Sequence, residues 1–176
     1  MINKAKVLSF VLVIALLLVT SATIVAQDSM DEKTKPILFR ALLTPIDSSP
    51  PVSEDTPHTA IGSAVLLLGA DRTKLHYTVS YKGLSGEPIL AHFHMGSVTS
   101  AGGPVRTIFG KPEIEGAPVT PPKGTANTIS GVWSADDDQP LTEERVDQLL
   151  SNRIYINIHT PLNKSGEIQG LVVPIS

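Results

Sequence analysis

The sequence predicts an all-β fold, an antiparallel β-sandwich with Greek-key-like connections and one short helix before the last strands. The 14 prolines and 13 glycines separate short apolar runs, a pattern typical of many strands joined by turns. Lys74–Lys82 alternates apolar and polar residues with a period of two, as a half-buried strand does. One segment, which begins at Thr142, instead has the spacing of an amphipathic helix.

The predicted strands are apolar runs that end at turn residues. The first run is followed by the proline-rich segment 45–57, which is expected to be a loop. In the second run the apolar residues Ala64–Leu68 are continuous, which predicts burial on both faces of the strand. Residues 110–127 are rich in proline and glycine and are expected to be irregular. The predicted strands are Ile37–Leu43, Ile61–Leu68, Lys74–Lys82, Pro88–Met95, Val105–Phe109, Thr128–Trp133, Arg153–His159 and Glu167–Val173.

The predicted helix lies between the sixth and seventh of these strands. Thr142 can cap its N-terminus, and the two glutamates that follow suit the positive end of the helix dipole. We expect the helix to end at Asn152 or Arg153. Its narrow apolar stripe is formed by Val146, Leu149 and Leu150.

The N-terminal segment 1–26 has the order of a secretory signal peptide. Lys4 and Lys6 precede the apolar stretch Val7–Val19, and small residues then lead to a favoured cleavage position after Ala26. The alternative is an uncleaved membrane anchor, because the segment carries no charge after Lys6 and about 20 apolar residues span a bilayer.

This pattern divides the chain into three parts. Residues 1–26 are predicted to be a signal peptide or N-terminal membrane anchor, 27–36 a flexible leader, and 37–176 one β domain. In either case the domain lies outside the cytoplasm, secreted or attached to the membrane by its N-terminus.

The charge argues against a nucleic-acid-binding protein, and the cysteine content excludes a disulfide-stabilised domain. The formal net charge is −3, and it becomes −5 without residues 1–26, which hold two lysines and no acid. Such a surface repels phosphate backbones, so no nucleic acid is expected as a partner. The chain has no cysteine, so the stability of this exported domain must come from its core rather than from disulfides.

Three histidines are the candidate functional residues. His92 and His94 are one residue apart, so in a strand they share one face. His159 lies in Ile154–His159, where three isoleucines occupy the other face. We therefore expect all three histidines on outer strand faces, where imidazoles remain accessible. If the two strands are neighbours, the three rings can converge on copper or zinc.

Three interpretations of these histidines stay open. In the first they form a structural polar cluster, with hydrogen bonds to carbonyls or to a carboxylate such as Glu167. Asn157 and Thr160 can belong to the same cluster. In the second they bind a metal ion, and in the third they bind an organic or protein ligand together with Asn157 and Glu167. No nucleophile elbow, phosphate loop or metalloprotease motif occurs, so an enzyme is not the favoured prediction.

Several segments resemble the CHRD domain, the module first described in chordin. Ala91–Gly96 (AHFHMG) resembles its HIHxG-type segment. Tyr155–Thr160 (YINIHT) and Gly166–Gly170 (GEIQG) resemble its closing YVNVHT…GEIRG pattern. Ser49–Val52 resembles its opening, although the family's acid before the paired prolines is absent, and Gln169 replaces a frequent arginine.

The resemblance covers roughly residues 37–173 and implies a β-sandwich-like domain outside the cytoplasm, in a family whose molecular function is largely undefined. It predicts a non-catalytic extracellular binding or structural module, whose partner is an unknown extracellular protein or surface component. The alternative prediction is a copper- or zinc-binding protein, for redox chemistry or sequestration, that uses His92, His94 and His159.

Overall fold

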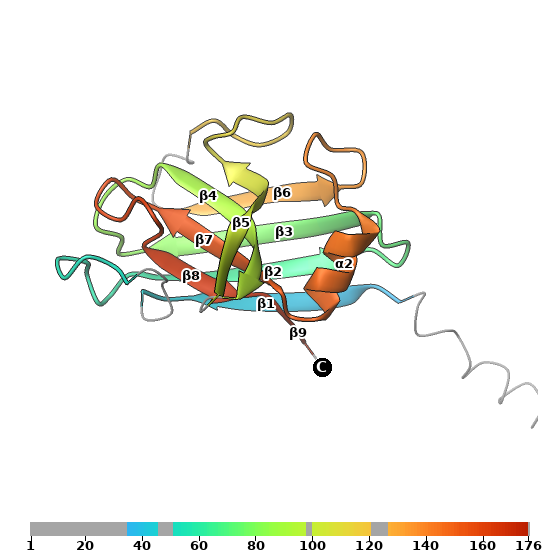
Figure 1. The fold of residues 1–176 in the computed structure, drawn as a ribbon, viewed down its shortest axis with the longest axis horizontal. Helices are drawn as coiled ribbons and strands as arrows, with labels where there is room; N and C mark the ends of the chain where they lie inside the picture. The colour runs from blue at the N-terminus through green and yellow to red at the C-terminus, as the bar shows by residue number, and fades with distance from the viewer. Residues whose placement is uncertain (1–34, 46–50, 98–99, 121–126, 176) are drawn as a thin grey trace, which may run out of the picture. The chain divides into compact units, whose positions relative to one another are not determined.

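The computed structural model describes residues 35–45, 51–97, 100–120 and 127–175 (Figure 1). The predicted signal peptide or anchor and most of the predicted leader lie outside these residues. Among the described residues, no helix is long and apolar enough to cross a membrane.

Two antiparallel sheets form the domain, which confirms the all-β sandwich. The five-stranded sheet has the order β6-β3-β2-β1-β9, and the four-stranded sheet has the order β5-β4-β7-β8. The chain passes between the sheets after β3, β5, β6 and β8. The strands are β1 (Ile37–Leu43), β2 (Ile61–Leu68), β3 (Lys74–Lys82), β4 (Leu90–Ser97), β5 (Ser100–Phe109), β6 (Thr128–Ser134), β7 (Ile154–His159), β8 (Ile168–Leu171) and β9 (Val173–Pro174).

Alternation of apolar residues explains how the sheets face each other. In β3 the apolar residues are buried and the polar ones are exposed or half-buried, as predicted. In β2 the prediction of burial on both faces is wrong, because burial alternates along the whole strand. Val65 and Leu67 are 54% and 42% exposed, since they lie on the sheet face that points away from the core.

Large side chains from both sheets fill the space between them. Phe93 from β4 stacks on Trp133 from β6, with ring centroids 5.3 Å apart. Tyr77 from β3 meets the same Phe93 edge-on at 5.2 Å. Such aromatic pairs bury much apolar surface, so this contact joins the two sheets at the centre of the core.

The helix α2 (Glu143–Leu150) forms where the sequence predicts it. The Thr142 side chain accepts a hydrogen bond from the Arg145 backbone N–H, the geometry of an N-cap. The helix ends at Leu150, two residues before the predicted end, and Leu150 is 42% exposed. The predicted stripe was therefore wrong at this position, because the short helix buries Val146 and Leu149 together with Gln148 instead.

The largest differences from the predicted strand boundaries are in the last strand and in β5. The last predicted strand is divided into β8 and β9, which belong to different sheets. β5 begins five residues earlier than predicted, because the glycine-rich segment after residue 100 pairs with the end of β4. A Cβ on Gly102 would overlap the Met95 carbonyl oxygen, so this close pairing requires glycine. The described part of 110–127 before β6 contains no strand, as expected.

Candidate functional site: a three-histidine cluster

The pairing of β4 with β7 brings the three histidines together. In this antiparallel register His92 lies opposite Asn157, His94 opposite Tyr155, and His159 opposite Leu90. Residues that lie opposite each other share a face, so all three rings stand on the face of the sheet turned away from the core. The convergence predicted for neighbouring strands is confirmed, because one nitrogen from each ring lies within 4.8 Å of the other two.

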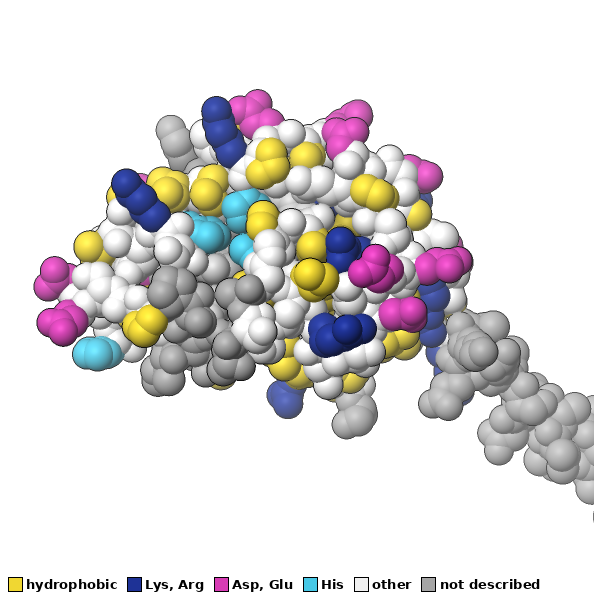
Figure 2. All heavy atoms as spheres, viewed as in Figure 1, with side chains coloured by type: hydrophobic (Ala, Val, Ile, Leu, Met, Phe, Trp, Pro, Cys, Tyr) yellow, Lys and Arg dark blue, Asp and Glu magenta, His cyan; other side chains and the backbone are white. Residues whose placement is uncertain are grey.

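The histidines are buried, which corrects the prediction that they are accessible. His92, His94 and His159 are only 5%, 9% and 6% exposed. The reason is that segments which the strand pattern cannot place, among them those at Lys111 and Lys164, reach over this face. Figure 2 shows that some histidine atoms remain visible between their neighbours on this side of the molecule.

Each imidazole uses one nitrogen to contact a backbone carbonyl. The His92 Nε2 lies 2.7 Å from the Lys111 oxygen, and the His159 Nδ1 lies 2.9 Å from the Lys164 oxygen. The His94 Nδ1 lies 3.0 Å from the oxygen of Gly102, in the early part of β5. A carbonyl oxygen only accepts, so each of these nitrogens must carry the proton and donate it.

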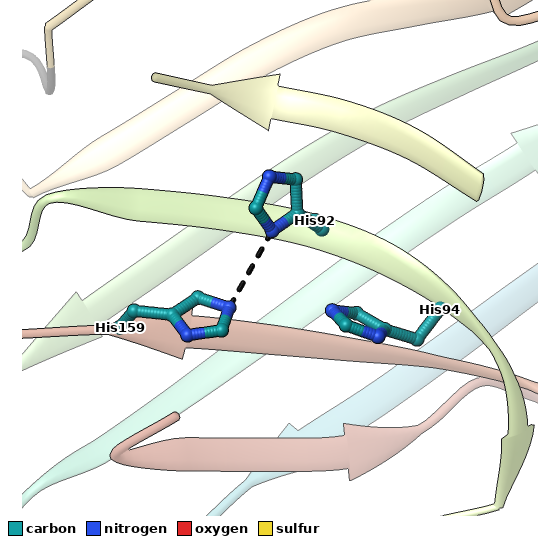
Figure 3. Close-up of side chains that lie close together, drawn as sticks. All are labelled: His92, His94 and His159. Atoms are coloured by element: carbon teal, nitrogen blue, oxygen red, sulfur yellow. Dashed lines mark hydrogen bonds between the residues drawn. The ribbon is translucent and has the colours of Figure 1, made fainter. Parts of the chain in front are cut away.

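The other nitrogen of each ring points into the space between the rings (Figure 3). The His92 Nδ1 and the His159 Nε2 are 3.4 Å apart, and the His94 Nε2 has no hydrogen-bond partner. Because the single proton of each neutral ring is already used, these three atoms present lone pairs to one another.

Burial keeps the rings neutral. It lowers the pKa of His92 and His94, although each hydrogen bond to a carbonyl raises the pKa in part. Burial likewise lowers the pKa of His159 to about 4, where the carbonyl contact opposes the shift and the other two histidines add to it. At neutral pH the cluster therefore consists of three uncharged imidazoles.

The distances suit a transition-metal ion. Zinc–nitrogen bonds of about 2.0–2.1 Å in tetrahedral geometry place two ligand nitrogens about 3.3–3.4 Å apart. The pair formed by His92 and His159 already has this separation, at 3.4 Å. The His94 nitrogen lies within 4.8 Å of the other two. The carbonyl contacts also match the usual environment of metal-binding histidines, whose second nitrogen donates to a carbonyl or carboxylate.

The two other predicted site residues have different surroundings. Asn157 lies on the same face and donates to the Ser165 carbonyl oxygen at 3.0 Å, while its Oδ1 has no hydrogen-bond partner. Glu167 was predicted as a possible partner of the histidines, and that contact stays a prediction. Its carboxylate accepts hydrogen bonds from Ser85, Thr160 and Asn163, which hold the loop before β8.

The Glu167 cluster holds a charge inside the protein. Burial raises the pKa of Glu167, but the hydrogen bonds from its three partners lower it by more, so the net pKa lies below its ordinary value. Charge-assisted hydrogen bonds of this kind are about twice as strong as neutral ones. The ionised carboxylate therefore stabilises the loop that also carries the Lys164 carbonyl.

Sequence reasoning missed Tyr155 and the three carbonyls as neighbours of the cluster. The Tyr155 ring stacks on His94, with centroids 4.9 Å apart and an angle of 23° between the planes. Alternation along β7 places Tyr155 on the histidine face, and Tyr155 begins the YINIHT segment, but neither signal indicates that its ring contacts His94. The carbonyls belong to the backbone and leave no signal in the sequence.

The CHRD domain family model matches residues 39–172, a range that contains all three histidines, Asn157 and Glu167. The chain belongs to the CHRD domain family. CHRD domains are typically extracellular. None of the curated proteins and none of the solved structures in the comparisons matches the chain. Membership therefore accounts for the fold of this CHRD domain, and its function has to be argued from the histidine cluster.

Proposed function

We propose that this protein is an exported CHRD module that binds one copper or zinc ion through His92, His94 and His159. The observation that carries the proposal is the direction of the protons. All three N–H groups point outward to carbonyl oxygens, and three lone pairs point inward to a common position. Buried acceptors without a donor are unfavourable, and a cation at this position would satisfy all three at once.

The ligand set supports copper or zinc rather than a hard cation. Imidazole is a common ligand of zinc and copper, whereas calcium and magnesium take oxygen ligands. The sequence and the described residues supply no complete catalytic set beside the cluster, so we propose metal binding without a chemical reaction. The extracellular protein or surface component predicted from the sequence remains the proposed partner of the module.

Metal analysis of the untagged protein tests the proposal. After treatment with a chelator, the protein is incubated with copper or zinc, dialysed, and analysed for metal content. We expect about one bound ion per protein molecule. At a free metal concentration near 1,000 times Kd, binding adds about 4 kcal/mol to the free energy of unfolding, which should raise the midpoint temperature of thermal unfolding by about 10 °C. The His94→Gln variant should lose most of both effects.

His76→Gln is the matched control. His76 is exposed on β3, in the other sheet, so its loss should change neither metal content nor the thermal shift. The proposal fails if the wild-type protein retains no more metal than a variant in which all three clustered histidines are glutamine. It also fails if His76→Gln lowers metal binding as much as His94→Gln.

A structural role is the second candidate, and a specific observation favours it. Each histidine donates to a carbonyl in a different segment, at Gly102, Lys111 and Lys164, and so attaches these segments to the sheet. In this case glutamine at position 94 would lower the thermal stability of the metal-free protein, and metal would leave the unfolding temperature of the wild type unchanged.

A further inference from the structure

The proposed metal site consists of neutral ligands. In the part of the chain that the structure describes, the group able to hold an ion contains His92, His94 and His159, and no carboxylate or thiolate belongs to it. Glu167, eight residues after His159, turns its carboxylate to Ser85, Thr160 and Asn163. The charge of a bound ion is therefore not compensated by its protein ligands.

Other side chains near the ligands supply no charged donor. The Tyr155 hydroxyl is directed to the Gly102 carbonyl oxygen at 3.5 Å. Met95 follows His94 in β4, but its sulfur contacts the Gln148 Nε2 at 3.3 Å on the other side of the strand. The Asn157 Oδ1 on this face has no hydrogen-bond partner, but it belongs to a neutral amide. The donors that these residues offer are therefore uncharged.

Charge decides which ion fits such a site best. The electrostatic cost of moving an ion out of water rises with the square of its charge, so it is roughly four times larger for a divalent than for a monovalent ion. The ring nitrogens sit on side chains that are 5–9% exposed, so water replaces little of the lost solvation. Three neutral ligands alone therefore stabilise a monovalent ion at a smaller desolvation cost than a divalent ion, whose second charge an additional anion would offset.

We infer that the cluster prefers cuprous copper, held by three histidines, and that a divalent ion binds there only together with a small anion as fourth ligand. This inference rests on the proposed metal-binding function. It involves no electron transfer, because the copper is taken up in the reduced state.

Competition with chromophoric chelators tests the inference. Cu(I) affinity is measured without oxygen against bicinchoninate, and Cu(II) and Zn(II) affinities are measured against chelators of divalent ions. We expect Cu(I) to bind at least 100-fold more tightly than Cu(II), which raises the copper reduction potential by about 120 mV over that of the aqueous ion. Azide should strengthen Zn(II) binding and leave Cu(I) binding unchanged.

The Asn157→Asp variant tests the charge argument directly. Asn157 lies opposite His92 on the same face, and aspartate has nearly the same shape with a negative charge. We expect the preference for Cu(I) over Cu(II) to fall in this variant. An unchanged preference in a folded variant would overturn the inference. If circular dichroism shows that the variant does not fold, the azide titration of the wild-type protein decides, and Zn(II) binding that azide does not strengthen overturns the inference.

The outcomes separate the inference from the proposed function. If Cu(II) or Zn(II) binds as tightly as Cu(I) without an added anion, the inference is overturned while metal binding stands. If none of the three ions binds more tightly than to the variant without the clustered histidines, both are overturned.

Discussion

Lowering the pH from 8 to 5 is expected to destabilise the metal-free domain through His159. Burial lowers the pKa of this residue to about 4, while in the unfolded chain it has its ordinary value of 6.5. Between these two values the unfolded chain binds the proton and the folded domain does not. The free energy of unfolding therefore falls as the pH falls, and the full stability is present above about pH 6.5.

The magnitude follows from the two pKa values. At pH 5 the unfolded residue is almost fully protonated and the folded one is almost neutral, which removes about 2 kcal/mol of stability. The loss reaches about 3 kcal/mol when the pH falls below 4, because each unit of pKa difference corresponds to about 1.4 kcal/mol. The pKa values of His92 and His94 are lowered as well, so they change stability in the same direction.

Urea unfolding between pH 5 and pH 8, with a chelator present, measures this effect. His159→Gln should lose about 2 kcal/mol less than the wild-type protein over this range, since glutamine does not titrate. His76→Gln serves as the control, because it replaces an exposed histidine in the other sheet. An equally steep loss of stability in His159→Gln and in the wild type would refute the assignment of this pKa shift to His159.

Two further substitutions test the support of the cluster. Glu167→Gln should destabilise the domain by about 2–4 kcal/mol at pH 7, because it replaces a buried carboxylate that accepts several hydrogen bonds. Glu87 is exposed, so the control Glu87→Gln should change stability by less than about 0.5 kcal/mol. Equal urea midpoints for the two variants would contradict this role. Gly166→Ala should lower the free energy of unfolding by about 1–3 kcal/mol, since the φ of Gly166 is +124° and a Cβ there would overlap Asn157. A Cβ on Gly103 would have no atom within 4 Å, so Gly103→Ala should leave stability nearly unchanged. Thermal unfolding of both variants measures the difference.

Local patterns were sufficient for the type of most elements. Period-two alternation correctly assigned β3, and the cap at Thr142 correctly marked the start of α2. The same patterns gave wrong predictions where the packing of the whole domain decides which residues are buried and where a strand begins. The apolar run in β2 says nothing about which face is covered, and the glycine-rich start of β5 forms a strand only because β4 lies beside it.

For the histidine cluster, too, some features follow from local sequence patterns and others depend on the folded domain. Alternation along one strand is a local property, so the sequence alone places His92 and His94 on one face and places His159 on the face of its strand that the isoleucines do not occupy. The register of β4 against β7 brings the third ring to the other two, and segments distant in sequence bury all three. Which nitrogen of each ring carries the proton depends on the folded domain, because carbonyl oxygens at Gly102, Lys111 and Lys164 select the nitrogen that donates. Backbone carbonyls are the same in every residue, so their position is a property of the fold alone.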